Sequence, residues 1–180
     1  MSLAAPKEDS SLPRVEALSL GNRVAVMRDG AIVQCGPPTE VYDDPATEFV
    51  GGFLGSPPMN FLTGTVRAAE AGLRIDLGGQ SLAVPAALSS FEGETLRLGI
   101  RPEAIVVTDG PAAATVRGEL EVLEPLGSST LLTTRVSGQT VKVQAPPGFR
   151  ADEGGPSNLY LPPEACRWYD PETGMLLPGA

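Results

Sequence analysis

An internal repeat in the second two-thirds of the chain constrains the fold more than any single motif does. Residues 79–84 read Gly-Gln-Ser-Leu-Ala-Val, and residues 138–143 read Gly-Gln-Thr-Val-Lys-Val. The Leu-Gly-Ile-Arg-Pro-Glu-Ala-Ile of residues 98–105 is answered by Leu-Tyr-Leu-Pro-Pro-Glu-Ala-Cys at residues 159–166. Each copy is too short to close a hydrophobic core alone, so we expect the two copies to fold together as one unit.

The repeat region has the pattern of half-buried β-strands. Apolar residues alternate with polar ones in Leu73-Arg74-Ile75-Asp76-Leu77, and a second such segment begins at Ser81. Gly78-Gly79 between them indicates a hairpin turn. The 21 glycines and 18 prolines among 180 residues indicate many turns. We therefore predict a mainly β fold over residues 59–180, an OB-like barrel built from two intertwined repeats.

The region before the repeats predicts a small α/β unit. Residues 24–27 form a continuous apolar run, typical of a strand buried on both faces, and residues 31–35 return as its partner after an Asp-Gly turn. Thr39 is expected to cap one short helix, and a second should begin near Thr47. In that second helix the apolar residues at helical spacing are Phe49, Val50, Phe53 and Leu54.

A junction at residues 55–62, Gly-Ser-Pro-Pro-Met-Asn-Phe-Leu, separates these two regions. Two successive prolines cannot continue a helix, so we place a domain boundary after residue 58. Residues 15–58 then form the α/β remnant, which starts with a short helix end at residues 15–20. Residues 1–14 are expected to be a disordered leader or the start of an expressed fragment.

Five segments in the same order resemble the ABC transporter ATPases of the maltose and multiple-sugar importer type. They are residues 15–30, 34–46, 49–55, 55–62 and 98–103. The resemblance implies that residues 15–58 end a nucleotide-binding domain and that residues 59–180 are its OB-like, transport-associated regulatory domain. It further implies a longer parent protein that binds ATP and Mg²⁺ and hydrolyses ATP to drive carbohydrate uptake.

The sequence departs from that family where the chemistry would lie. It has no histidine, no Gly-x-x-x-x-Gly-Lys-Ser/Thr loop, and no apolar strand that ends in an Asp-Glu pair. The Gly-Gly-Gln at residues 78–80 superficially resembles the ABC signature, but its flanking strands favour a turn. Carboxylates are numerous without an accompanying histidine or basic cluster. We therefore expect no catalytic, cofactor-binding or metal-binding residues in this chain, which should not hydrolyse ATP alone.

Charge and cysteine content restrict the partners. The net charge of −9 disfavours nucleic acid and anionic membranes as direct partners. No apolar stretch approaches the roughly 18 residues that span a bilayer, and no signal-peptide pattern is present. Cys35 and Cys166 lack CxxC spacing and are expected to be reduced core residues. We expect a cytoplasmic protein, which the resemblance places at the inner face of the membrane.

Candidate interface or regulatory residues cluster near the junction and at the Pro-Glu corner. The Arg101 guanidinium beside a rigid proline suits a bidentate pair across an interface or a corner. The second repeat keeps Pro-Glu but has Pro162 in place of Arg101, so the shared part is architectural and Arg101 is free to specialise. Both a structural corner and a functional contact remain open. The candidates are Asn60, Phe61, Arg101, Pro102, Glu103 and Gly127.

An oxyanion-binding module is the alternative function. Molybdate-type modules resemble this fold and carry Ser-Ala-Arg-Asn where a new strand begins. Here that place is taken by Ser56-Pro57-Pro58-Met59-Asn60, so methionine stands at the arginine position. Asn60, Ser56 and backbone amides remain as candidate anion ligands, without the positive charge.

We expect the chain to self-associate. The resemblance implies a homodimer coupled to two membrane-spanning permease subunits, with a regulatory protein as a further partner. Independently, the remnant should expose apolar side chains that favour association. These are Val24, Val26, Ile32, Phe49, Phe53 and Leu54.

Overall fold

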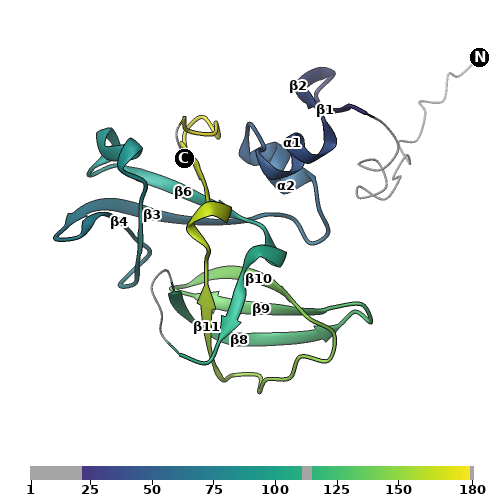
Figure 1. Ribbon diagram of the computed structural model, residues 1–180, viewed down its shortest axis with the longest axis vertical. Coiled ribbons are helices and arrows are strands. Elements are labelled where there is room, and N and C mark those ends of the chain that lie inside the picture. Colours follow the sequence, from purple (N-terminus) through teal and green to yellow (C-terminus); the bar gives the residue numbers. More distant parts are fainter. Residues whose placement is uncertain (1–21, 111–114, 179–180) are drawn as a thin grey trace, which may run out of the picture.

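The computed structural model describes residues 22–110 and 115–178, which form a small helical segment with a β-hairpin and a larger β domain (Figure 1). The predictions for residues 1–14 and 15–20 lie outside the described residues. The first region contains β1 (Val24–Arg28), β2 (Ala31–Gly36), α1 (Pro38–Asp43) and α2 (Glu48–Phe53). The β domain contains β3 (Asn60–Ala69), β4 (Gly72–Asp76), β5 (Ser81–Ala83), η2 (Ala86–Phe91), β6 (Thr95–Ile100), η3 (Pro102–Ala104), β7 (Val106–Thr108), β8 (Thr115–Pro125), β9 (Thr130–Val136), β10 (Gln139–Ala145), β11 (Pro156–Tyr160), η4 (Pro163–Ala165) and β12 (Arg167–Tyr169).

The β domain consists of two five-stranded antiparallel sheets that exchange strands. One sheet has the order β12-β6-β3-β4-β5, and the other has the order β10-β9-β8-β11-β7. The last strand of the first repeat, β7, pairs with β11, and the last strand of the second repeat, β12, pairs with β6. When β3–β7 are matched with β8–β12, the two strand orders become identical. The predicted mainly β fold of two intertwined repeats is therefore confirmed.

A single hydrophobic core joins the two repeats. Along β3 the buried and partly buried residues alternate, so that Leu62 and Val66 point inward, as expected for a half-buried strand. Leu132 and Val136 of β9 enter the same core from the second repeat. The apolar side chains of each repeat are therefore buried against those of the other, and neither repeat could form this core alone.

The β1–β2 hairpin is present with the predicted turn, and Asp29 and Gly30 adopt positive φ values of 51° and 80°. The prediction that β1 is buried on both faces is wrong. Val26 is 3% exposed, whereas Met27 is 54% exposed. Within the described residues the hairpin pairs with no further strand and is packed on one face only, which leaves the other face open.

The two helices begin differently. Thr47 caps α2 as predicted, since its hydroxyl accepts a hydrogen bond of 3.2 Å from the Val50 N–H. Thr39 is not a cap, because α1 begins at Pro38 and Thr39 lies inside its first turn. Proline is favoured at this first helical position, and it determined where α1 starts. Among the described residues no helix is long and apolar enough to cross a membrane.

The prediction for the two cysteines is half right. Both are free thiols, and Cys166 is buried in the β domain. Cys35 is exposed, because it lies on the open side of the two-stranded hairpin.

Candidate functional site at the junction of the helices and the β domain

Arg101 joins the carboxyl ends of both helices to the β domain. Its Nη1 atom donates hydrogen bonds to the carbonyl oxygens of Gly51, at 3.1 Å, and Leu54, while Nη2 donates to the Tyr42 carbonyl at 2.7 Å. Gly51 and Tyr42 lie in the last turns of α2 and α1, and Leu54 is the residue directly after α2. At these positions a helix leaves carbonyl acceptors without internal partners. Arg101 is 6% exposed, so its guanidinium bonds to groups of the junction and has little contact with solvent.

Tyr42 and Glu103 complete the Arg101 site. The Arg101 guanidinium carbon lies 3.8 Å from the centre of the Tyr42 ring, in a cation–π arrangement. The Tyr42 hydroxyl donates a hydrogen bond of 2.6 Å to Glu103 Oε1. Burial and the bond to Glu103 raise the pKa of Tyr42 to about 12, and burial lowers the pKa of Arg101. Pro102 is buried and begins η3, the short helix that contains Glu103.

Further polar contacts run from β6 and β12 to the helical segment. Arg97 on β6 forms an ion pair with Glu48 at the start of α2, and Arg167 on β12 forms one of 2.7 Å with Asp44. The buried Tyr169 hydroxyl donates to the Pro45 carbonyl at 3.0 Å. These contacts hold the helices on the sheet that contains β12, β6 and β3.

The C-terminal segment adds backbone pairing to the junction. The Glu48 N–H donates to the Gly174 carbonyl at 2.9 Å, and the Leu176 N–H donates to the Ala46 carbonyl at 3.0 Å. The same segment bridges back to Tyr169 at the end of β12. Backbone hydrogen bonds therefore link the helical segment directly to the end of the second repeat.

Phe61 belongs to this junction, whereas Asn60 holds the two repeats together. The Phe61 ring meets Tyr169 edge to face, with 5.6 Å between centroids, and it packs against Gly51 of α2. The Asn60 amide donates to the Lys142 carbonyl at 2.8 Å and accepts from the Lys142 N–H at 2.7 Å. Asn60 thereby ties β3 to β10 of the other repeat.

Gly127 is not part of the junction. It lies in the turn between β8 and β9 with φ +86°, next to the exposed side chain of Leu126. The structure thus brings Phe61, Arg101, Pro102 and Glu103 together, and it places Asn60 between the repeats and Gly127 in a hairpin.

The helical partners of Arg101 were not predicted from the sequence. Two glutamines that join the repeats were not predicted either. Gln139 donates from Nε2 to the Thr63 carbonyl at 3.0 Å and accepts from the Thr63 N–H at 2.8 Å. Gln80 makes the equivalent pair of bonds to the backbone of Arg117. The signal was available, because glutamine occupies the same place in both copies of the repeat.

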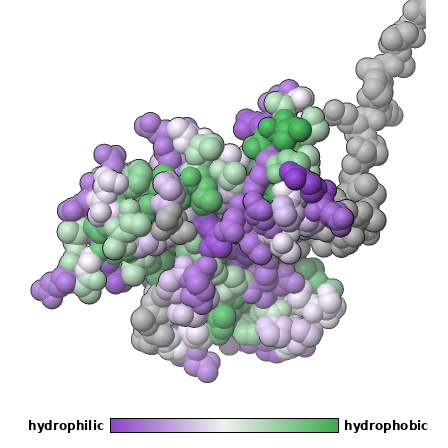
Figure 2. Space-filling view, turned by 45° about the horizontal axis from the view of Figure 1, so that its top comes forward, coloured by the Kyte–Doolittle hydropathy of each residue, from purple (hydrophilic) through white to green (hydrophobic). Residues whose placement is uncertain are grey.

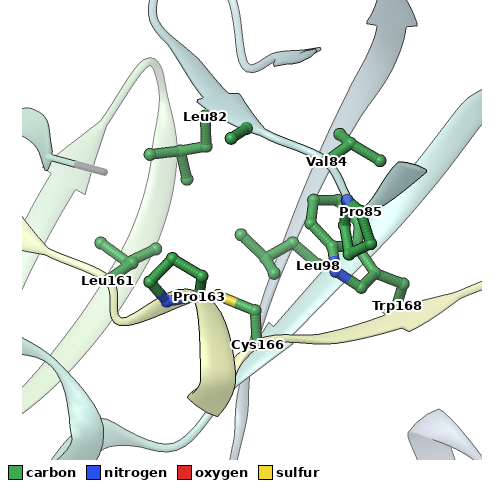
Figure 3. A pocket seen from close by; sticks show the side chains of 9 residues that line it. Leu82, Val84, Pro85, Leu98, Leu161, Pro163, Cys166 and Trp168 are labelled. Atoms are coloured by element: carbon green, nitrogen blue, oxygen red, sulfur yellow. The ribbon is translucent and has the colours of Figure 1, made fainter. Parts of the chain in front are cut away.

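An apolar cavity lies where the two repeats meet, near the exchanged strand β12. Its volume is about 190 Å³, and Figure 3 shows side chains that surround it from β5, β6, η4 and β12, among them Leu82, Leu98, Cys166 and Trp168. Burial raises the pKa of the Cys166 thiol to about 12, so the thiolate that nucleophilic chemistry needs is scarce at neutral pH. The lining contains no charged side chain.

Taken together, the fold and its junction define an OB-type β domain attached to the end of a helical unit. Residues 55–105 match the family described as MalK OB fold domain, and residues 98–168 match the TOBE domain family. The predicted OB-like fold is therefore confirmed.

Curated relatives extend the similarity to the helical segment. The chain is 44% identical over 161 residues to the sn-glycerol-3-phosphate import ATP-binding protein UgpC of Chromohalobacter salexigens, covering 87% of this chain and 42% of that protein. It is 38% identical over 161 residues to UgpC of Chromobacterium violaceum, covering 89% and 43%. The chain thus spans less than half the length of these relatives. Together these matches support a fragment of an ATP-binding subunit of a multiple-sugar-type ABC importer, and this fragment carries the OB-fold and TOBE region.

A solved structure of the cytoplasmic molybdate-binding protein ModG is a partial structural match. It superposes with a TM-score of 0.48 at 16% identity, covering 61% of this chain and 94% of that one. A similarity at this level carries no functional argument.

Proposed function

We propose that this chain is the regulatory and dimerisation region of an ABC importer subunit that binds and hydrolyses ATP to drive uptake of a carbohydrate or related solute. The matches to OB-fold and TOBE domains and to import ATP-binding proteins support this role. The chain itself lacks a phosphate-binding Gly-x-x-x-x-Gly-Lys-Ser/Thr loop, so ATP hydrolysis belongs to the complete subunit.

The Arg101 junction is the observation that carries the proposal. One buried guanidinium holds the last turns of both helices, and ion pairs from Arg97 and Arg167 act beside it. Because a buried charge with several hydrogen bonds is costly to separate, the helices and the β domain should move as one body. A regulatory domain that follows, or restrains, an ATPase domain needs such a rigid connection.

The proposed partners follow from the same role. The complete subunit would work as a homodimer with two permease subunits at the inner face of the membrane, and a regulatory protein would act on it there. Self-association through the helical segment is less favoured than the sequence suggested, since Val26 and Leu54 are buried rather than exposed. Ile32 and Phe53 do stay exposed. We therefore propose that the β domain supplies the main contact between copies.

The oxyanion-binding alternative is not favoured by the geometry. Both polar atoms of the Asn60 amide are bonded to the Lys142 backbone, and Met59 is buried. Residues 56–60 therefore present few groups that an anion could use.

A chimera tests the proposed function. In the Chromohalobacter salexigens relative, the matched region is replaced by residues 22–178 of this chain, and uptake of sn-glycerol-3-phosphate is measured in cells that lack the relative. We expect the chimera to restore uptake. A chimera that is folded and assembled with its permease but gives no uptake would overturn the proposal.

A further inference from the structure

Two arginines stand directly opposite each other on the β3–β4 hairpin. Arg67 pairs with Arg74 in the antiparallel register, on the outer face of the sheet. Like charges at directly paired positions destabilise a sheet unless a counter-charge is present. The pairing is notable in a chain with only 13 basic residues and a net charge of −9.

Arg74 is held in place by its neighbour strand. Its Nε atom donates to the Ser81 hydroxyl at 2.7 Å, and Nη2 donates to the Ser81 carbonyl at 2.5 Å. These bonds orient the guanidinium before any ligand arrives. Among the described residues, Nη1 of Arg74 has no hydrogen-bond acceptor.

Asp76 neutralises only part of this charge. Its Oδ2 lies 3.5 Å from Arg67 Nε, while its Oδ1 accepts hydrogen bonds from the N–H groups of Gly78 and Gly79. The carboxylate is therefore shared between the turn and one arginine. Within the part of the chain that the structure describes, the Nη atoms of Arg67 have no acceptor.

The two guanidinium groups line a surface pocket of about 310 Å³. Asp76, Gly79 and Ser81 contribute to its walls with Ala68 and Ala69. Guanidinium groups bind phosphate in bidentate fashion, and two of them side by side match a doubly charged oxyanion. We propose that this pocket binds a tetrahedral oxyanion, either inorganic phosphate or the phosphate group of a small monoester, between Arg67 and Arg74.

This site is separate from residues 56–60 and from the Arg101 junction. The β3–β4 hairpin extends away from α1 and α2, at the other side of the molecule in Figure 1. Anion binding here does not depend on the proposed importer role. It would give the β domain a means to respond to a small phosphate-bearing solute.

Thermal unfolding of the full chain tests the site. Sodium phosphate, phenyl phosphate and sodium chloride are compared at equal ionic strength, because a ligand that binds the folded state raises Tm by mass action. We expect phosphate or phenyl phosphate to raise Tm above the chloride value. Isotope-edited NMR should show the amide signals of Gly79 and Ser81 shifting with the same dissociation constant. A response to the monoester alone would identify an ester as the source, and a response to both would identify any small phosphate.

Arginine variants locate the anion. Arg67→Gln and Arg74→Gln should each raise the dissociation constant about tenfold or more, since each change removes charge-assisted hydrogen bonds to the anion. Arg150→Gln is the matched control, because Arg150 is exposed and, among the described residues, its side chain bonds to the carbonyl of its neighbour Phe149 alone. Arg67 is exposed as well, so its variant should fold even if Arg74→Gln does not. Equal Tm values in phosphate and chloride, or a phosphate response that survives Arg67→Gln, would overturn the proposal.

Discussion

Gln80 and Gln139 make the same contact from opposite repeats. Each side-chain amide bonds both the N–H and the carbonyl of one residue on the other repeat, Arg117 for Gln80 and Thr63 for Gln139. In each case the bonded residue precedes a glycine on the first strand of its repeat. The two amides are therefore related by the approximate two-fold symmetry of the β domain. Each one ties its own repeat to the first strand of the other repeat.

Removing these amides should destabilise the β domain unequally. Gln139→Ala leaves a partly buried N–H and carbonyl without partners, which should cost about 1–3 kcal/mol. Gln80→Ala acts at an exposed contact, where water replaces the amide, and should cost about 1 kcal/mol or less. Urea unfolding with an unchanged m-value measures both. A Gln80 variant that loses more stability than the Gln139 variant would contradict this ranking.

The glycines that follow the bonded residues should not tolerate a methyl group. A Cβ atom at Gly64 would lie 2.5 Å from the Asp76 carbonyl oxygen, and one at Gly118 would collide with the Thr134 side chain. Overpacking of this kind costs about 1–3 kcal/mol, so Gly64→Ala and Gly118→Ala should both lower the urea midpoint.

Gly52→Ala is the control for these two variants. Outside its own helix, the nearest described atom to a Cβ there would belong to the Phe61 ring, at 3.7 Å, and the residue lies inside α2. Because alanine favours a helix, this change should be neutral or stabilising by up to about 1 kcal/mol. Equal losses at all three positions would show that the close contacts are not the cause.

Arg101 should be more important for stability than the exposed arginines. Arg101→Met removes the donors that bind the Gly51, Leu54 and Tyr42 carbonyls, and each such bond is worth about 1.5–3 kcal/mol. We expect a loss of at least about 2 kcal/mol in urea unfolding and faster proteolysis within residues 22–55. Arg150→Met should leave both unchanged. Resistance to protease that persists in Arg101→Met would mean that other contacts are sufficient to fix the helices.

The junction should weaken at high pH through Tyr42. Its pKa is raised from 10.0 to about 12, so the neutral phenol is favoured in the folded state. This contribution to stability is complete below pH 10 and is lost as the pH rises from 10 to about 12. Between pH 9 and 11.5 the wild-type chain should lose more stability than Tyr42→Phe, in which the other alkaline groups still titrate. Parallel pH profiles for the two proteins would show that ionisation of Tyr42 does not cause the loss of stability.

The repeat made much of the β domain predictable from sequence. Recurring Gly-Gln and Pro-Glu segments indicated two equivalent units that need each other, because neither could fill a core alone. The partners of Arg101 were not predictable, since Tyr42 lies 59 residues away and a carbonyl acceptor has no sequence signature. The same limit applies to Thr39, where Pro38 determined the start of the helix instead. The burial of Val26 and Leu54 also depended on packing between β1, α1 and α2, which no local pattern encodes.

If the β domain works in an importer subunit through a rigid connection to its helices, solute uptake should depend on Arg101. The most direct measurement is sn-glycerol-3-phosphate uptake by the chimera carrying either the natural region, Arg101→Met or Arg150→Met, each at matched expression. We predict uptake with the natural region and with Arg150→Met, and at least a severalfold reduction with Arg101→Met. Full uptake with Arg101→Met would contradict the role of the junction, and no uptake with the natural region in an assembled transporter would contradict the proposed function itself.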